Sequence, residues 1–151
     1  MREPDNIEIR KASKKDLDEI CELEQICFHE DAFSKRQFSY LIKKAKGEFV
    51  VVRKNKLIAY LIFLRRKNSK KYRIYSIAIA PEARGLGIAK KLLEYAEGVA
   101  LKNNIHQISL EVSENNESAI NLYLKQKYQI AGSKPDYYFD GSSAIIMEKE
   151  F

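Results

Sequence analysis

The segment from Tyr72 to about Ala100 constrains the fold more than any other part of the chain. It opens with β-branched and aromatic residues and runs to Pro81, which has no amide donor and so ends a strand. Gly85 and Gly87 follow shortly afterwards. Apolar residues then recur at helical intervals, namely Ile88, Leu92, Leu93, Ala96 and Ala100. The pattern predicts a strand over 72–80, a tight glycine loop and a helix ending near 103–104.

This glycine loop predicts an anion site. Glycine permits positive φ angles and lets the backbone approach a ligand closely. The first amides of the following helix have no intrahelical acceptor, and the helix dipole favours negative charge there, so a pyrophosphate suits the position. A bare pair of glycines more often only closes a turn. A Walker loop and a dinucleotide fingerprint are excluded, because the chain has neither a Gly-Lys-Ser/Thr ending nor a third glycine at Rossmann spacing.

The loop resembles the signature of the GCN5-related N-acetyltransferase (GNAT) superfamily, which reads Arg or Gln, two residues, Gly, one residue, then Gly or Ala. Arg84, Gly87 and Ala89 satisfy it. The resemblance implies that acetyl-CoA is the cosubstrate and that the strand holds its pantetheine arm through Ile77, Ala78 and Ile79. It also implies that the loop and first helical turn bind its pyrophosphate, through Arg84, Gly85, Leu86, Gly87, Ile88, Ala89 and Lys90.

A second segment, over residues 110–123, resembles the RimI-like protein N-terminal acetyltransferases of this superfamily. Its Leu-Glu-Val sequence around Glu111, its Asn116 and the Leu-Tyr pair ending at Tyr123 match their spacing. The resemblance implies cofactor contacts from Asn116, Ala119 and Tyr123. Taken alone, Glu111 is typical of a solvent-facing strand residue, Tyr123 of a core aromatic and Asn116 of a helix cap.

The same resemblance implies the catalytic roles. Acyl transfer to an amine must remove a proton from the ammonium and return one to the departing thiolate. Glu111 is expected to act as the general base through water, and Tyr123 as the general acid. The phenol pKa of ~10 lies close enough to the ~8.5 of a thiol for this proton transfer.

Two other segments resemble the acceptor-binding loops of these enzymes. Residues 28–34 occupy the place of an aromatic loop, with Ala32-Phe33-Ser34 where relatives carry Pro-Trp-Ser. Residues 137–141 resemble a Tyr-Tyr-x-Asp-Gly hairpin of archaeal and eukaryotic relatives. The resemblance implies that the acceptor, a protein N-terminus, contacts Phe33, Glu111, Tyr137 and Tyr138. Without it, the two tyrosines are equally typical of cross-strand aromatic pairing.

The chain departs from these relatives at further places, among them Ser113, where they commonly carry Arg or a similar residue. It reads Lys127-Tyr128 where they usually have Gly-Phe, and Gly141-Ser142-Ser143-Ala144 where they often have Gly-Glu-Asp-Ala. An α-amino group, with a pKa of ~7.7 to 8.0, is more often neutral at pH 7 than a lysine at ~10.4, which favours N-terminal acetylation. The alternatives left open are a small-amine or polyamine acetyltransferase and a non-catalytic acyl-CoA- or RNA-binding module.

The remaining patterns complete a mixed α/β chain. Strands are predicted at 7–11, 107–112, 127–131 and 143–149, and a hairpin at 48–53 and 57–65 around Lys54-Asn55-Lys56. Helices are predicted from a Ser13–Asp16 cap to Cys27, from Ser34 through Ala45 with Gly47 as the stop, and from Asn116. A length of 151 residues predicts a single domain, 1–151, and the resemblance implies a GNAT fold: a central, mostly antiparallel sheet with helices on both faces.

Charge and cysteine content bear on ligands and location. The balance of 27 basic to 21 acidic residues suits an anionic ligand, an acidic partner or nucleic acid without choosing among them. The basic run 65–73 is predicted to be a solvated hairpin connection, with ribosomal RNA as the alternative partner. Two cysteines and two histidines lack the spacing of a metal site, so no metal is expected.

No membrane segment or secretory leader is expected either. The longest apolar stretch, 57–64, is far shorter than the ~20 residues of a membrane span. The N-terminal residues alternate polar and charged side chains and lack the apolar core of a signal peptide. We expect a cytoplasmic monomer or weak homodimer that acts on protein N-termini, with the ribosome as a candidate partner and no binding to DNA or membranes.

Overall fold

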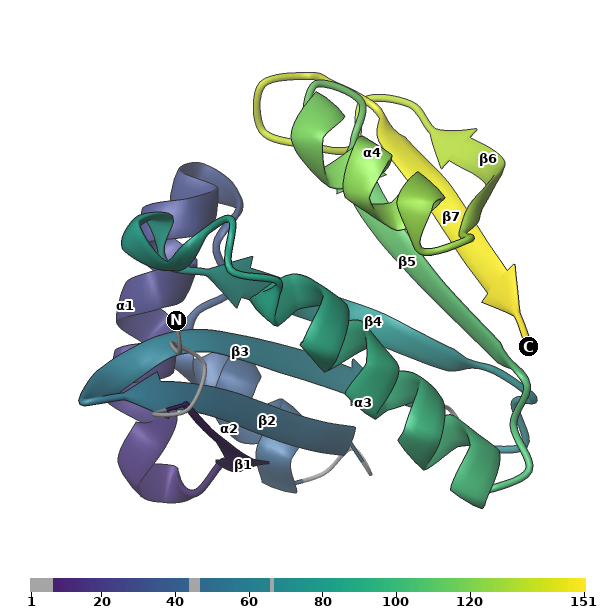
Figure 1. The fold of residues 1–151 in the computed structure, drawn as a ribbon. Coiled ribbons are helices and arrows are strands. Elements are labelled where there is room, and N and C mark those ends of the chain that lie inside the picture. Colours follow the sequence, from purple (N-terminus) through teal and green to yellow (C-terminus); the bar gives the residue numbers. More distant parts are fainter. Residues whose placement is uncertain (1–6, 44–46, 66) are drawn as a thin grey trace.

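A single sheet organises the chain in the computed structural model, which describes residues 7–43, 47–65 and 67–151. Within these ranges seven strands lie in the order β1-β2-β3-β4-β5-β7-β6. The strands are β1 (Glu8–Lys11), β2 (Gly47–Lys54), β3 (Lys56–Leu64), β4 (Tyr72–Ile79), β5 (Gln107–Ser113), β6 (Gln129–Lys134) and β7 (Ala144–Glu150) (Figure 1). The α-helices are α1 (Leu17–Phe28), α2 (Lys35–Lys43), α3 (Ile88–Lys102) and α4 (Glu117–Lys125).

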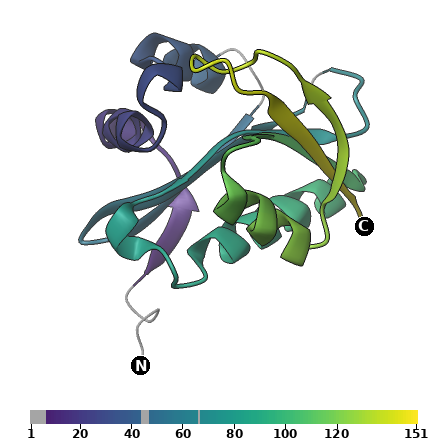
Figure 2. The same ribbon diagram turned by 90° about the horizontal axis from the view of Figure 1, so that it is seen from above.

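Helices cover both faces of the sheet, as predicted. Figure 2 shows α1 and α2 on one face and α3 and α4 on the other. All neighbouring strands pair antiparallel except β4 and β5, which are parallel. This is the mixed α/β architecture, with a mostly antiparallel sheet, that the sequence predicted.

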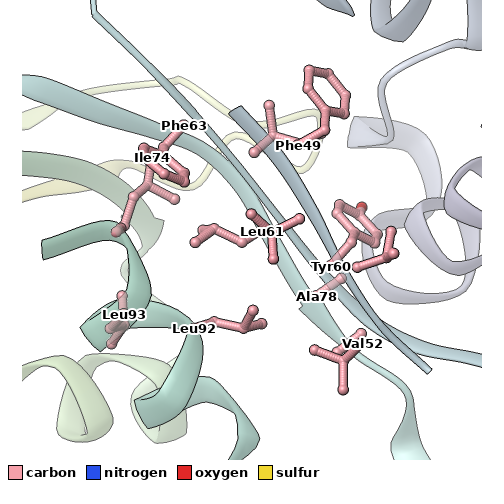
Figure 3. Close-up of a cluster of buried hydrophobic side chains, with 14 of the residues drawn as sticks. Phe49, Val52, Tyr60, Leu61, Phe63, Ile74, Ala78, Leu92 and Leu93 are labelled. Atoms are coloured by element: carbon pink, nitrogen blue, oxygen red, sulfur yellow. The ribbon is translucent and has the colours of Figure 1, made fainter. Parts of the chain in front are cut away.

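The core is centred on β3, whose residues after Lys56 are all buried. A strand covered by helices on both faces must be apolar on both, which explains its unbroken run of hydrophobic residues. On one face Tyr60 points toward the N-terminal helices, where its ring centroid lies 6.2 Å from that of Phe38 in α2. On the other face Leu92 and Leu93 of α3 complete the packing (Figure 3).

Strands β4 and β5 separate soon after they begin. Their pairing is limited to two residue pairs, Tyr72 with Ile108 and Arg73 with Ser109. The register between β3 and β4 shifts because Ile62 pairs with Ser76 while the next residue, Phe63, pairs with Ile74. Tyr75 is therefore an extra residue in β4 with no partner in β3. Such a β-bulge bends its strand and increases the local twist. It therefore accounts for the V-shaped divergence of β4 from β5 (Figure 1).

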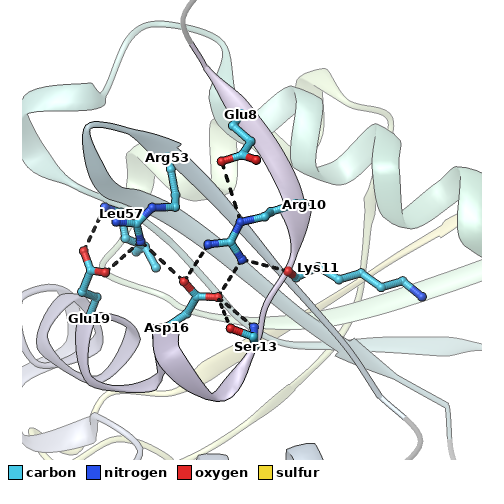
Figure 4. A network of polar contacts seen from close by, with 8 residues as sticks. All are labelled: Glu8, Arg10, Lys11, Ser13, Asp16, Glu19, Arg53 and Leu57. Carbon is cyan, nitrogen blue, oxygen red and sulfur yellow. Dashed lines mark hydrogen bonds and ion pairs between the residues drawn. The ribbon is translucent and has the colours of Figure 1, made fainter.

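The buried carboxylate of Asp16 ties the N-terminal strand to the first helix. It accepts two hydrogen bonds from the guanidinium of Arg10, at 2.8 and 2.9 Å, and one from the backbone N–H of Ser13 at 2.8 Å. Arg53 of β2 lies 3.5 Å away and also contacts Glu19 at 2.8 Å (Figure 4). The predicted Ser13–Asp16 cap is present within this larger network.

Several predicted boundaries were wrong. The second helix is described over Lys35–Lys43, and Ala45 lies outside the described residues; Gly47, predicted as the helix stop, is the first residue of β2. The strand predicted at 127–131 runs instead from Gln129 to Lys134. Its start moves because Lys127, at φ 75, takes a left-handed conformation that closes α4 and cannot belong to a strand.

The turn between β2 and β3 was predicted to comprise the triplet Lys54-Asn55-Lys56, but it is shorter. Lys54 and Lys56 pair with each other, leaving only Asn55 at the tip. Asn55 has a φ of 70°, a conformation that asparagine tolerates better than most residues.

Candidate active site

The glycine loop lies between the end of β4 and the start of α3. Gly85 and Gly87 have φ angles of 83° and 77°, which favour glycine. A Cβ added at either position would meet no atom within 4 Å, so these glycines serve the backbone conformation and leave open space beside it. Gly87 is also the N-cap of α3, whose first turn carries no acidic residue. Its first amides are therefore available to an anionic ligand.

The backbone of β4 presents polar groups toward the divergence. The N–H of Ala80 donates to the carbonyl of Ile58 at 2.8 Å, so the groups of the preceding residue, Ile79, face away from β3. Strand alternation gives Ile77 the same orientation. This is the geometry that the predicted hydrogen bonding of a pantetheine arm requires. Ala78, by contrast, pairs with Tyr60 of β3, so its backbone is already used in the sheet.

The side chains of the loop differ in what they offer a cofactor. Arg84 folds back so that its Nε donates to the carbonyl of Ile79 at 3.2 Å. Ile88 is buried in the core, which leaves only its backbone for a ligand. Leu86 and Lys90 are exposed and Ala89 is half-buried. A pyrophosphate here would meet main-chain amides and the cation of Lys90, while Arg84 would have to leave Ile79.

Glu111 projects from β5 into an ion cluster. One carboxylate oxygen accepts from Arg73 of β4 at 2.9 Å, and the other lies 2.6 Å from the ammonium of Lys134 in β6. Burial raises the pKa of Glu111, but hydrogen bonds from Lys134 and Tyr137 and the nearby positive charges outweigh burial. The net pKa lies below the ordinary value, so Glu111 is ionised at neutral pH.

Tyr123 lies in α4 with a buried side chain. Desolvation raises its pKa to about 12, so the phenol keeps its proton at neutral pH. Asn116 caps the same helix, since its Oδ1 accepts from the backbone N–H of Ala119 at 3.2 Å. The capping role is thus present, and it leaves the amide nitrogen of Asn116 for other contacts.

The two predicted acceptor loops lie side by side. The backbone N–H of Phe139 donates to Oδ1 of Asp31 at 2.9 Å, which joins segments more than one hundred residues apart. Next to this contact, the rings of Tyr137 and Tyr138 meet edge-on with centroids 4.9 Å apart. Tyr137 also reaches Glu111, whose proximity contributes to raising the Tyr137 pKa after burial.

Phe33 is fixed by a buried carboxylate that the sequence did not single out. Its backbone N–H donates to Oε2 of Glu24 at 3.0 Å. The other oxygen of Glu24 accepts from the hydroxyls of Tyr60 and Ser76, the latter at 2.8 Å. The 29–33 loop is therefore anchored to β3 and β4 through α1. A glutamate on the apolar face of α1 was the signal that could have indicated this role.

The ion partners of Glu111 were missed as well. Arg73 lies in β4, within the strand predicted over 72–80, but it was grouped with the solvated basic run, whereas it pairs with Glu111. Lys71, from the same basic run, pairs with Glu148 of β7 at 3.0 Å. Arg66 of that run lies outside the described residues. No local sequence pattern connects these partners, because their proximity depends on strand order.

A hollow of ≈ 410 Å³ lies beside Glu111. Its charged lining consists of Lys71, Arg73, Lys134 and Glu111. Apolar and hydroxyl groups complete it, including Tyr75, Ser109 and Ile146. Three cations against one carboxylate give this hollow a positive character.

Within residues 7–43, 47–65 and 67–151, no three His, Cys, Asp or Glu side chains cluster as metal ligands would. None of the helices in these ranges has the length and apolar character needed to span a bilayer.

The open glycine loop at the N-terminus of α3, beside two diverging strands, offers main-chain amides that suit a phosphate-bearing ligand. Residues 16–128 match the profile of the Acetyltransferase (GNAT) family, and the chain belongs to this family. It is an acetyl-CoA-dependent N-acetyltransferase. The loop amides and the backbone of Ile77 and Ile79 fit this cosubstrate.

Similar proteins include several N-acetyltransferases. An uncharacterized N-acetyltransferase of Methanocaldococcus jannaschii is 31% identical over 94% of this chain and 90% of its own length. An N-alpha-acetyltransferase of Saccharolobus solfataricus is 29% identical over 93% and 91%. The crystal structure of the ribosomal-protein-S18-alanine N-acetyltransferase from Escherichia coli superposes with a TM-score of 0.84 at 25% identity, over 95% of this chain and 93% of that chain.

Proposed function

We propose that this enzyme acetylates the N-terminal α-amino group of proteins. The observation that carries the proposal is the contact between Asp31 and Phe139, which holds the two aromatic loops together next to the Glu111 cluster. An extended chain end, presented between two loops, is the kind of acceptor that such an arrangement can hold. The relatives named as N-alpha- and ribosomal-protein-alanine acetyltransferases support the same substrate class.

We infer that Glu111 and Tyr123 carry the proton transfers. Acetyl-CoA supplies a thioester that a neutral amine attacks directly, forming the N–C bond as the C–S bond breaks. Glu111, ionised and beside the acceptor loops, attracts the ammonium and takes its proton through water. Tyr123 holds a proton at neutral pH and gives it to the departing thiolate, after which solvent reprotonates the phenol.

The charge of the hollow counts against a polyamine acceptor. Lys71, Arg73 and Lys134 line the space beside Glu111, and like charges repel when they approach within a few ångströms. A protein N-terminus brings only one positive charge to Glu111. We further infer a cytoplasmic enzyme whose acceptors are nascent or ribosomal proteins.

The direct test is an acceptor panel with acetyl-CoA. It should contain peptides with free N-termini, the same peptides with blocked N-termini and an internal lysine, and spermidine. Mass spectrometry is expected to place the acetyl group on the α-amine of the free peptides only. Turnover of spermidine without turnover of any free peptide would favour the small-amine alternative.

The catalytic roles are tested separately. Glu111→Gln and Tyr123→Phe should each lower kcat by about 100-fold or more, the usual contribution of a positioned acid or base. If both variants retain the wild-type kcat across the pH range, Glu111 and Tyr123 do not have these roles.

A further inference from the structure

We propose that the hollow beside Glu111 is a specificity site for an acidic side chain of the acceptor protein, at its second or third residue. This inference rests on the proposed N-terminal acetylation and adds the acceptor sequence that the site prefers. The ligand chemistry is a carboxylate held by lysine and arginine side chains.

The charges around the hollow are unevenly matched. Arg73 and Lys134 share the single carboxylate of Glu111. Lys71 is paired outside the lining, with Glu148 of β7. A second carboxylate entering the hollow would therefore meet three cations whose counter-charges are the carboxylates of Glu111 and, outside the lining, Glu148. Charge-assisted hydrogen bonds of this kind are about twice as strong as neutral ones.

These cations have hydrogen-bonding capacity left. Each lysine ammonium has three donors, and both side chains keep more than two fifths of their surface exposed, at 43% for Lys71 and 45% for Lys134. Nε of Arg73 is buried and finds no acceptor among the described residues. The guanidinium lies over the ring of Tyr75, 4.7 Å from its centroid. The two partly exposed lysine ammonium groups therefore offer a carboxylate donors that the protein itself does not use.

Chain geometry limits the position of the acidic residue. Lys71 immediately precedes β4 and Arg73 is the second residue of that strand, so their Cα atoms lie at most about 6.6 Å apart along the chain. An acceptor whose amino group lies at Glu111, in contact with Arg73, advances about 3.3 Å per residue. Its second or third side chain then comes level with Lys71. A space of ≈ 410 Å³ is large enough for such a side chain.

The experiment compares acceptor peptides that share their first residue and differ only at positions two and three, which are both Glu, both Gln or both Lys. The measured quantity is the ratio of kcat/KM between peptides for each enzyme variant, which cancels changes in overall activity or folded fraction. The wild type is expected to prefer Glu over Gln by about tenfold and Gln over Lys. The preference should shrink with added salt, because the side chains are partly exposed.

Variants at Lys71 test the site without altering the partners of Glu111. Lys71→Gln should bring the Glu-to-Gln ratio close to one, and Lys71→Arg should retain it. Lys71→Glu should invert the order, so that the Lys peptide becomes the best of the three. Lys67→Gln removes the same charge from an exposed position on the same connection and should leave the wild-type ratio unchanged.

The outcomes separate this inference from the proposed function. Acetylation of all three peptides at the α-amine with equal kcat/KM would leave the proposed function intact and overturn the specificity site. An equal loss of preference in Lys67→Gln and Lys71→Gln would also overturn it, since general charge would then be the cause. Failure of every peptide to be acetylated would overturn both.

Discussion

Tyr128 carries a buried hydroxyl that the fold does not use. Its side chain is 1% exposed, and its hydroxyl has no hydrogen-bond partner within the described ranges. Burying a polar group without a partner costs about 1–3 kcal/mol. Phenylalanine keeps the ring that packs 5.9 Å from the ring of Tyr123 and removes only this oxygen. Tyr128→Phe is therefore expected to raise the free energy of unfolding by about 1 kcal/mol or more.

The matched control is Tyr60→Phe, the same deletion at a tyrosine that is 0% exposed. Here the hydroxyl donates to the buried carboxylate of Glu24 and lies 3.3 Å from the hydroxyl of Ser76. Removing it takes a donor from a buried carboxylate, and hydrogen bonds to charged groups contribute about 1.5–3 kcal/mol. Tyr60→Phe should lose stability by that amount.

Urea unfolding of the three proteins measures both effects. Tyr128→Phe should unfold at a higher urea concentration than the wild type, and Tyr60→Phe at a lower one. In a thermal scan, a change of 1 kcal/mol would shift the Tm of a chain of this length by about 2–4 °C. The m-values should agree, which would show that the surface exposed on unfolding is unchanged. If Tyr128→Phe destabilises as much as Tyr60→Phe, the hydroxyl of Tyr128 has a partner in solution and the reasoning is refuted.

Three further perturbations follow from the backbone and the ion network. Lys127→Gly should raise the free energy of unfolding, measured in urea, by about 0.5–1 kcal/mol. The left-handed conformation costs a non-glycine residue about 1–2 kcal/mol, which exceeds the entropy cost of glycine. A lower free energy of unfolding would contradict this. Gly87→Ala should cost about 1–2 kcal/mol from φ alone and weaken acetyl-CoA binding in calorimetry, whereas unchanged affinity would argue against this loop as the cofactor site. The pKa of Asp16 is lowered chiefly by its hydrogen bond from Arg10, so its stabilisation is complete above the ordinary value of 3.8 and is lost as pH falls through the lower folded pKa. The free energy of unfolding of Asp16→Asn should be lower than that of the wild type at pH 7, and the two values should converge in strong acid. A difference that stays constant with pH would show that Asp16 acts by packing.

Elements with strong local signals could be predicted from the sequence. The unbroken apolar run of β3 and the helical spacing of apolar residues in α3 can be recognised from neighbours along the chain alone. The bulge at Tyr75 could not be predicted, because it is a property of how β4 pairs with β3. The predicted start of β6 was wrong for a related reason. The residue types Lys127 and Tyr128 do not show that Lys127 takes a left-handed conformation, which is more common for glycine.

The parts of the candidate site also differ in how well the sequence predicts them. The glycine loop is contiguous in the sequence and was identified from its residue pattern. Its positive φ angles at Gly85 and Gly87 agree with the predicted tight turn. The cluster around Glu111 is not contiguous. Lys134 of β6 reaches Glu111 of β5 across β7, which lies between these two strands. A side chain brought across an intervening strand leaves no periodic trace in the sequence.

In the proposed mechanism, the cations beside Glu111 have opposite effects on its roles as a base and as a binding group for the acceptor ammonium. By lowering its pKa they make it a weaker base, yet they also keep it charged and fixed in orientation at the pH where an α-amine begins to be neutral. An arriving ammonium can replace Lys134 as a partner of the carboxylate, and the displaced lysine is then free to turn toward an acidic residue of the acceptor. On this view one exchange of ion partners couples recognition of the acceptor sequence to positioning of the amine. The unequal charge of the hollow is then what allows one carboxylate to serve both.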